Sequence, residues 1–188
     1  MSRECFEQEQ PELDVNHQVL IDEAGVNLGL VRSYGRAPSG CRAVGDKPVN
    51  PGPNISLVGA LGIDGVRAIM MVEGAVNGPL FTGFLEQLLA PVLKPGDQVW
   101  LDNLSVHKVD GVAEVIEAQQ AELHYLPRYS PEFSPMELCW SKLKAWLRGA
   151  APRTIEALEG EIRNALDEIT ESDIKGWFAH CGYYIEPD

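Results

Sequence analysis

The sequence predicts an α/β fold in which a mixed five-stranded sheet carries helices. Three apolar, strand-like runs come first along the chain, and two further strands then alternate with helical patterns. Strands joined through a helix run parallel and are covered by it, whereas strands joined by a short turn run antiparallel. The predicted sheet therefore has three antiparallel strands followed by parallel β-α units, with further helices at the C-terminal end.

Each predicted strand is a short apolar run bounded by turn-forming residues. The five strands are expected at residues 18–23, 55–61, 66–72, 98–102 and 123–126. The second and third flank Gly62-Ile-Asp-Gly65, which predicts the turn of a hairpin. A further short extended piece is expected at residues 28–33, at the start of a loop rich in Gly and Pro.

Each predicted helix has apolar residues at helical spacing. The helices are expected at residues 77–93, 109–120, 134–148 and 154–169, followed by a short tail around Trp177. The buried stripe of the first is expected at Leu80, Phe84, Leu88 and Val92.

Composition divides the chain into three parts. Residues 1–17 are polar and acidic and are expected to be a flexible lead-in. Residues 18–150 hold the whole sheet and are expected to form the main domain. Residues 151–188 are expected to be a helical extension packed on it.

The chain of 188 residues is acidic, with a formal net charge of −13. This balance argues against a protein that grips nucleic acid alone, since such proteins usually carry a basic face. Both ends of the chain are strongly acidic, however, and the residues between them are close to neutral.

The four cysteines, Cys5, Cys41, Cys139 and Cys181, lack the paired spacing of a zinc site. They indicate free thiols in a reducing compartment. No apolar run is long enough to span a membrane, and the polar N-terminus does not look like a signal peptide. A cytoplasmic location is therefore expected.

Residues 129–140, Tyr-Ser-Pro-Glu-Phe-Ser-Pro-Met-Glu-Leu-Cys-Trp, place Glu137 in the first turn of a helix. Pro135 suits the first helical position, because its missing N–H would have no helical partner there. Ser134 precedes the helix, and Glu137 follows it by three residues. This is also the spacing of a capping box, in which the two side chains satisfy each other's backbone N–H groups. Taken alone, Glu137 is better explained by capping.

Two further acids lie in or at the end of predicted strands. Asp22 sits in an apolar strand, where a charge needs a partner or a metal, although a capped strand end explains it equally well. Asp102 closes the fourth strand, and a turn with Asn103 explains it when taken alone. The carboxyl ends of strands are nevertheless where α/β proteins build their sites. The three acids together favour one site over three separate structural roles.

The spacing of these residues resembles that of one family. His107 follows Asp102-Asn103 in an Asp-Asn-x-x-x-His motif, and Glu137 lies in Tyr-Ser-Pro-x-x-x-Pro-x-Glu-x-x-Trp, with 34 residues between Asp102 and Glu137. Residues 18–183 thereby resemble the DDE transposases of bacterial insertion sequences, in the branch related to mariner elements. The resemblance includes Val19-Leu-Ile-Asp-Glu-Ala-Gly25.

The resemblance implies a ribonuclease H-like fold and a catalytic, metal-binding triad of Asp22, Asp102 and Glu137. It also implies two Mg²⁺ or Mn²⁺ ions that catalyse DNA strand cleavage and strand transfer in the movement of an insertion sequence. Such hard cations take oxygen ligands, and a pair of them can activate the attacking hydroxyl and stabilise the leaving oxygen. Glu23 should face the opposite side of its strand, so it is left out of the metal shell.

Several other residues are assigned supporting roles. Asn103 and His107 match motif positions, and His107 either contacts phosphate, positions a ligand or starts a helix. The expected DNA contacts are Arg36, Arg42, Lys108 and Lys144. Ordinary solvent exposure is the alternative for these four. The family commonly has Trp where this chain has Arg36, which leaves the loop contact open, and it usually has Asn where this chain has Ser134.

The partners implied by the resemblance are DNA, as transposon ends and target, and a dimer partner. That partner is either a second copy of the chain or a full-length transposase. Family members carry a helix-turn-helix region that recognises transposon ends, and only about seventeen residues precede the first strand here. We therefore expect this chain to be the catalytic half without that region.

Two other functions stay open. A catalytically silent, truncated transposase could act as an interaction or inhibitory partner of a full-length enzyme, and such a chain has no need of an intact triad. A carboxylate-pair glycosidase would work without divalent metal, but it does not explain the 34-residue spacing.

Overall fold

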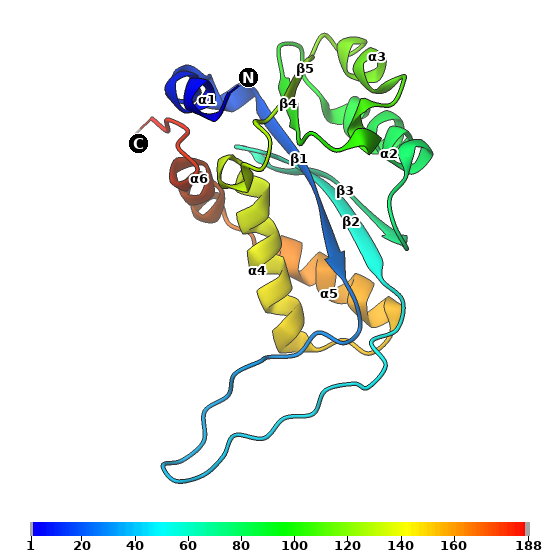
Figure 1. Cartoon of the computed structure of the whole chain (residues 1–188), viewed down its shortest axis with the longest axis vertical. Helices are drawn as coiled ribbons and strands as arrows, with labels where there is room; N and C mark the ends of the chain where they lie inside the picture. The colour runs from blue at the N-terminus through cyan, green and yellow to red at the C-terminus, as the bar shows by residue number, and fades with distance from the viewer. Residues whose placement is uncertain (1, 187–188) are drawn as a thin grey trace.

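Five strands form one mixed sheet, in the order β3-β2-β1-β4-β5 (Figure 1). The computed structural model describes residues 2–186, apart from the side chains of residues 105 and 106. The strands are β1 (Gln18–Val26), β2 (Ile55–Gly62), β3 (Gly65–Glu73), β4 (Gln98–Leu101) and β5 (Glu122–Tyr125). β2 pairs antiparallel with β1 and β3, whereas β4 pairs parallel with β1 and β5. The predicted mixed sheet is confirmed.

Helices cover both faces of this sheet (Figure 1). They are α1 (Arg3–Glu9), α2 (Gly78–Phe84), α3 (Val112–Glu117), α4 (Pro135–Ala150), α5 (Ile155–Asp167) and α6 (Glu171–His180). Leu20 of β1 shares a core with α4, α5 and α6, whereas its neighbours Val19 and Ile21 share the opposite core with α2 and α3. Consecutive β1 residues thus enter opposite cores, as strand alternation requires. Within residues 2–186, no helix is both long and apolar enough to cross a membrane.

The N-terminal segment departs from the expected flexible lead-in. Residues 3–9 form α1, and two short 3₁₀ turns connect it to β1. Phe6 is completely buried, with its ring centroid 5.1 Å from that of Trp100 and 4.8 Å from that of Phe133. The prediction of a flexible segment relied on its acidic composition. It was wrong because one buried aromatic side chain, Phe6, attaches the segment to the core.

The helical segment after β3 changes type along its length. α2 continues as a π-helical turn at Leu85–Leu89 and then as a 3₁₀ turn at Ala90–Val92. A π turn holds more residues than an α turn and rotates the following side chains around the axis. The prediction that the buried stripe continues through Leu88 and Val92 is therefore wrong, since each of these two residues is 40% exposed. Phe84 is buried as predicted, and the other fully buried side chains of this segment are Phe81, Leu85 and Leu89.

Two further expectations are corrected. The helix predicted at residues 109–120 is confined to α3, because Gly111 takes a left-handed φ of 95° immediately before it. The extended piece predicted at residues 28–33 is absent, since residues 27–54 form one irregular loop. This loop extends away from the body of the molecule (Figure 1).

The base of the 27–54 loop is tied to the body by hydrogen bonds. The Leu28 N–H donates to the Pro51 carbonyl at 2.9 Å. The Arg153 guanidinium, from the segment between α4 and α5, donates to the Leu28 carbonyl at 2.9 Å. The two arms of the loop therefore leave the sheet together.

Candidate active site

Two of the predicted site acids, Asp22 and Asp102, lie at equivalent positions along the neighbouring strands β1 and β4. In the parallel β1–β4 pair, Leu20 lies opposite Trp100, and both belong to the core under α4. Asp22 and Asp102 each follow two residues later. Because side chains alternate along a strand, both acids lie toward the α4 face of the sheet.

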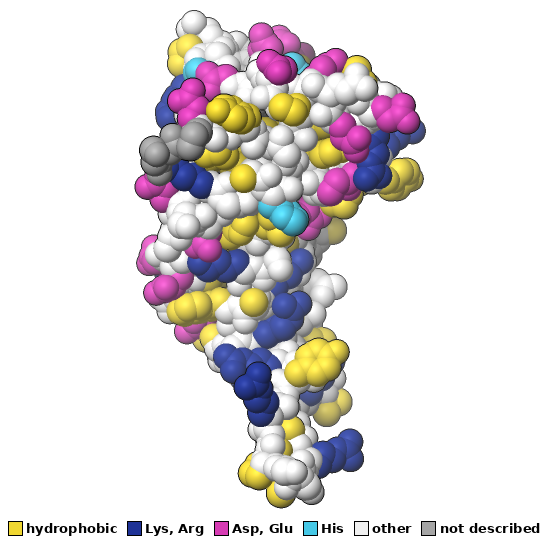
Figure 2. Space-filling model, turned by 90° about the vertical axis from the view of Figure 1, so that its left-hand side faces the viewer, with side chains coloured by type: hydrophobic (Ala, Val, Ile, Leu, Met, Phe, Trp, Pro, Cys, Tyr) yellow, Lys and Arg dark blue, Asp and Glu magenta, His cyan; other side chains and the backbone are white. Residues whose placement is uncertain are grey.

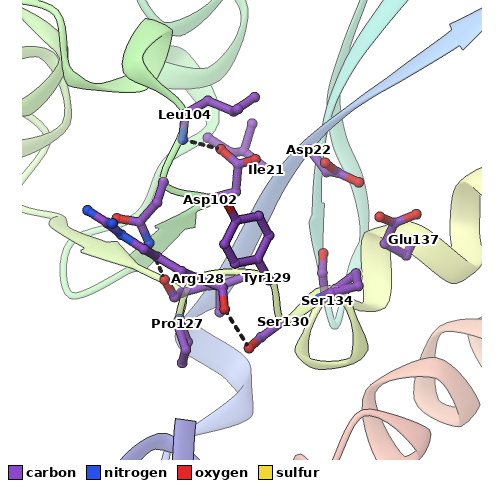
Figure 3. Close-up of a pocket in the computed structure, with 13 residues that line it drawn as sticks. Ile21, Asp22, Asp102, Leu104, Pro127, Arg128, Tyr129, Ser130, Ser134 and Glu137 are labelled. Carbon is purple, nitrogen blue, oxygen red and sulfur yellow. Dashed lines mark hydrogen bonds between the residues drawn. The ribbon is translucent and has the colours of Figure 1, made fainter. Parts of the chain in front are cut away.

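The third acid comes from the first turn of α4. Pro135 begins this helix, as predicted, and Glu137 follows it by two residues. Figure 3 shows the Glu137 carboxylate pointing toward Asp22 across the space between α4 and β1. The capping-box alternative is wrong, because Ser134 makes no side-chain capping hydrogen bond and its Oγ is buried without a partner.

The environment of Asp22 disfavours its negative charge. Burial is the largest cause, and together with the nearby charge of Glu137 it raises the pKa of Asp22 to about 7. The Oδ2 atom of Asp22 is buried without a hydrogen-bond partner. A bound cation would offset both effects, and hard divalent cations prefer carboxylate oxygens. Asp22 and Glu137 therefore fit a divalent metal ion.

Asp102 is turned toward different partners. Its Oδ1 accepts a hydrogen bond from the Leu104 N–H at 3.0 Å (Figure 3) and lies 2.6 Å from His107 Nδ1. Partial burial acts in the other direction, but these two contacts hold the pKa of Asp102 below its ordinary value. In the described part of the chain, no three His, Cys, Asp or Glu side chains are gathered closely enough to form a ready-made metal cluster. The structure thus brings Asp22 and Glu137 together and holds Asp102 against His107.

His107 belongs to the short 3₁₀ turn Ser105–Lys108 and is only 1% exposed. Its Nδ1 faces Asp102, and its Nε2 lies 3.3 Å from Glu23 Oε1. Burial lowers the pKa of His107, but the two carboxylates outweigh burial and raise it to about 9. Because so little of the residue is exposed, the suggested contact with DNA phosphate is wrong. Sequence reasoning placed Glu23 on the correct face but missed its contact with His107.

Asn103 and Lys108 are linked to each other beside the pocket. Asn103 Nδ2 donates to the Leu126 carbonyl, and its Oδ1 accepts a hydrogen bond from Lys108 Nζ at 2.9 Å. Lys108 Nζ also lies 5.1 Å from the ring centroid of Tyr125. Asn103 therefore joins the chain after β4 to the chain after β5, and Lys108 stays exposed beside it.

A pocket of about 450 Å³ is lined by all three acids, Asp22, Asp102 and Glu137. Arg128 and Tyr129, which follow β5, also line it, and Tyr129 is 96% exposed. Tyr129 has a φ of 57°, a left-handed conformation uncommon for such a residue. Sequence reasoning missed both residues as pocket residues, although Tyr129 begins the motif that marked Glu137.

The other predicted DNA contacts lie away from this pocket. Arg36 and Arg42 are exposed on the 27–54 loop, and Lys144 is half-buried on α4. In the described structure these three residues are not among those that line the pocket. On the face drawn in Figure 2, acidic side chains gather over the upper part of the molecule, whereas the lower part, which includes the loop, carries Lys and Arg.

The chain matches the model of a known protein family. Residues 17–159 match the family model described as "DDE superfamily endonuclease". No curated protein sequence matches the chain.

Solved structures of Mos1 transposase share the fold. The Mos1 transposase paired-end complex with left transposon end matches with a TM-score of 0.77 at 14% identity, over 95% of this chain and 56% of that chain. The Mos1 mariner paired-end complex with Mn matches with a TM-score of 0.70 at 18% identity, over 97% and 61%. The catalytic domain of Mos1 mariner transposase matches with a TM-score of 0.62 at 14% identity, over 97% and 90%.

These matches confirm the predicted ribonuclease H-like fold. The chain spans 56% and 61% of the two longer Mos1 chains, and it corresponds to most of the separate catalytic domain.

Proposed function

The chain belongs to the DDE superfamily endonucleases, and from this premise we propose that it is the catalytic domain of a transposase. The proposed reaction is metal-dependent cleavage of DNA strands and their transfer to a target during movement of a transposable element. The proposed catalytic residues are Asp22, Asp102 and Glu137.

The facing carboxylates of Asp22 and Glu137 carry this proposal (Figure 3). Two like charges beside each other, one with a buried unpartnered oxygen, are unfavourable unless a cation binds between them. A capping box does not explain Glu137, because the side chain of Ser134 makes no capping hydrogen bond to the first turn of α4. A site for cations is therefore the simplest reason for this arrangement.

The donor set also fits the proposed metal. Asp22, Asp102 and Glu137 offer carboxylate oxygens from two strands and one helix, and such ligands suit Mg²⁺ or Mn²⁺. A pair of these ions, when bound, would supply the charge that activates the attacking hydroxyl and stabilises the leaving oxygen. The protein's own part is to hold the three carboxylates at one pocket and to keep Asp102 oriented. Two Mos1 transposase structures were solved with Mn and with Mg, which supports this choice of ions.

DNA is the proposed substrate, and the charge distribution supports it. The 27–54 loop carries Arg32, Arg36, Arg42 and Lys47 against the single acid Asp46. Because phosphate contacts dominate affinity for DNA, an exposed basic loop on an otherwise acidic chain is the natural place for it to bind. Two further phosphate contacts are proposed. Lys108 donates to the pocket residue Asn103, and Lys144 lies on α4, the helix that carries Glu137.

In this proposal, the transposon ends and the target are recognised by a larger assembly that contains this chain. The paired-end complexes of Mos1 contain chains longer than this one. The proposal also includes a dimer of transposase chains that acts on paired ends. As expected from the sequence, the proposed location is the bacterial cytoplasm, and the nucleoid when DNA is bound. The alternative of a catalytically silent partner has no observation that favours it.

The test combines metal binding with DNA cleavage. Mn²⁺ is titrated by calorimetry into the wild-type chain and into the Asp102→Ala and Glu137→Ala variants, and nicking of supercoiled plasmid is followed in the same samples. Glu117→Ala, an exposed acid on α3, is the matched control. The proposal expects wild type and control to bind Mn²⁺ and nick DNA, and the two site variants to lose both.

Two results would count against it in different ways. Metal binding through these acids without nicking of the plasmid would support the metal site and overturn the catalytic activity of this chain. No binding of Mn²⁺ by the wild-type chain would overturn the metal site itself.

A further inference from the structure

The His107 ring joins two carboxylates that come from different strands. Its Nδ1 lies 2.6 Å from Asp102 Oδ1, after β4, and its Nε2 lies 3.3 Å from Glu23 Oε1, on β1. Asp22 and Glu23 are consecutive residues of β1, so their side chains leave the strand on opposite faces. β1 therefore contacts the site once directly and once through His107.

The ring cannot easily take another orientation. His107 is 1% exposed, and its ring centroid lies 4.4 Å from that of Phe81 in α2. Its backbone carbonyl accepts a hydrogen bond from the Tyr125 hydroxyl at 3.0 Å. Packing on one side and a hydrogen bond on the other thus fix the position from which the ring contacts Asp102.

Asp102, by contrast, has few fixed contacts of its own. It follows the last residue of β4, and its side chain is 46% exposed. Besides the 2.6 Å contact with His107 Nδ1, its carboxylate accepts one hydrogen bond, from the Leu104 N–H in the same turn. A carboxylate this exposed rotates freely unless a neighbour limits it, and His107 is the rigid neighbour.

We propose that Glu23 is a positioning residue of this site, which fixes the orientation of the Asp102 carboxylate through the buried ring of His107. The inference rests on the proposed function, in which Asp102 is a metal ligand. Residues that orient a metal ligand without touching the metal typically contribute 10–100-fold to metal affinity. Glu23 would then act on the metal from the opposite face of the sheet.

The test compares Mn²⁺ affinity in Glu23→Ala, Glu23→Gln and wild type by calorimetry. Glu23→Ala should weaken binding about 10–100-fold. Glu23→Gln should restore most of the affinity, because its amide oxygen can still accept a hydrogen bond from His107 Nε2. Glu122→Ala is the matched control, since it removes another Glu–His contact of the same sheet, 3.2 Å from His124 Nε2, away from the pocket.

A second readout needs no metal. The ¹³C resonance of the Asp102 carboxyl group, assigned by its loss in Asp102→Asn, should shift in Glu23→Ala and return in Glu23→Gln at constant pH. If Glu23 had a purely structural role, Glu23→Ala would lower the midpoint of urea denaturation. The Mn²⁺ affinity and the Asp102 resonance of the folded protein would then stay unchanged, and this result would overturn the inference.

The two proposals can fail separately. Absence of Mn²⁺ binding in wild type would overturn the proposed function, and the Asp102 resonance would still decide whether Glu23 positions that carboxylate. Equal Mn²⁺ affinity in wild type and Glu23→Ala would overturn the inference and leave the proposed function standing.

Discussion

Gly59 on β2 lies directly opposite Asp22 on β1, and its lack of a side chain lets α4 approach the sheet at this point. A Cβ atom at Gly59 would lie 2.8 Å from Trp140 Cη2 and would also meet Met136 Cε. Met136 and Trp140 flank Glu137 on α4. The approach of Glu137 to Asp22 therefore depends on the absence of a side chain at Gly59.

The first prediction concerns this close approach. Gly59→Ala should lower the free energy of unfolding by about 1–3 kcal/mol, because the Trp140 ring must move to admit the methyl group. Gly25→Ala, in the same strand pair, is the control, since nothing lies within 4 Å of a Cβ there. Urea denaturation measures both variants, and equal stabilities would contradict the prediction.

The start of α4 can be tested against the start of α5. Thr154 Oγ1 accepts a hydrogen bond from the Ala157 N–H at 3.1 Å, whereas the Ser134 hydroxyl is buried without a partner. Thr154→Ala should therefore cost about 1 kcal/mol of stability, and Ser134→Ala should cost nothing or stabilise the protein slightly. Thermal unfolding measures both. A loss in Ser134→Ala as large as in Thr154→Ala would restore the capping interpretation of Glu137.

The stability of the metal-free protein should depend on pH through Asp22. Its pKa is raised to about 7 in the folded state from an ordinary value of 3.8. The folded protein therefore holds a proton that the unfolded chain has released, and stability falls as pH rises from about 4 to about 7. Asp22→Asn removes this penalty. With EDTA present, its stability advantage over wild type should grow between pH 5 and pH 8 by on the order of 1–3 kcal/mol. A difference independent of pH in urea denaturation would show that Asp22 titrates normally.

The N-terminal helix should contribute strongly to stability through one residue. Phe6 is fully buried, so Phe6→Ala should cost about 3–5 kcal/mol. Cys5→Ala, an exposed change in the same helix, should have little effect. Urea denaturation compares the two. A small loss of stability in Phe6→Ala would instead support the flexible lead-in that composition predicts for this segment.

The basic loop should control the salt dependence of DNA binding. Removing two phosphate contacts in the double variant Arg36→Ala/Arg42→Ala should reduce the slope of log K against log salt by about 2. Arg163→Ala, an exposed arginine of α5 that pairs with Glu159, is the control. Fluorescence anisotropy of labelled duplex DNA over a range of NaCl concentrations measures the slope. An unchanged slope in the double variant would show that Arg36 and Arg42 do not contact DNA phosphates.

The mixture of antiparallel and parallel strands was predictable because it follows from short turns and from helical connections along the chain. The place of each acid on its strand or helix also depends on a local pattern, whereas the grouping of the three acids as one site came from the spacing of the motifs. Pro135 starts a helix through its own geometry, and this alone places Glu137 in the first turn. Asp22 and Asp102 end up on one face because strand alternation is independent of the rest of the chain.

Other features were not predictable because they depend on residues distant in sequence. The contact of Glu23 with His107 joins positions 84 apart, and neither residue has a local pattern that announces it. The burial of Phe6 likewise depends on Trp100 and Phe133. The π turn at Leu85–Leu89 shifts the buried face of its helix, which a pattern of period 3.6 cannot represent.

The adjacency of Asp22 and Glu23 restricts how evolution can alter the length of this chain. One residue inserted in β1 ahead of Asp22 would exchange the two faces of the strand and separate the acid from α4. An insertion within residues 34–53 would leave the register of β1 and β2 unchanged, because those residues form no ladder with the sheet. Among descendants of a common ancestor, gains and losses of residues should therefore accumulate in the loop, while β1 keeps its length.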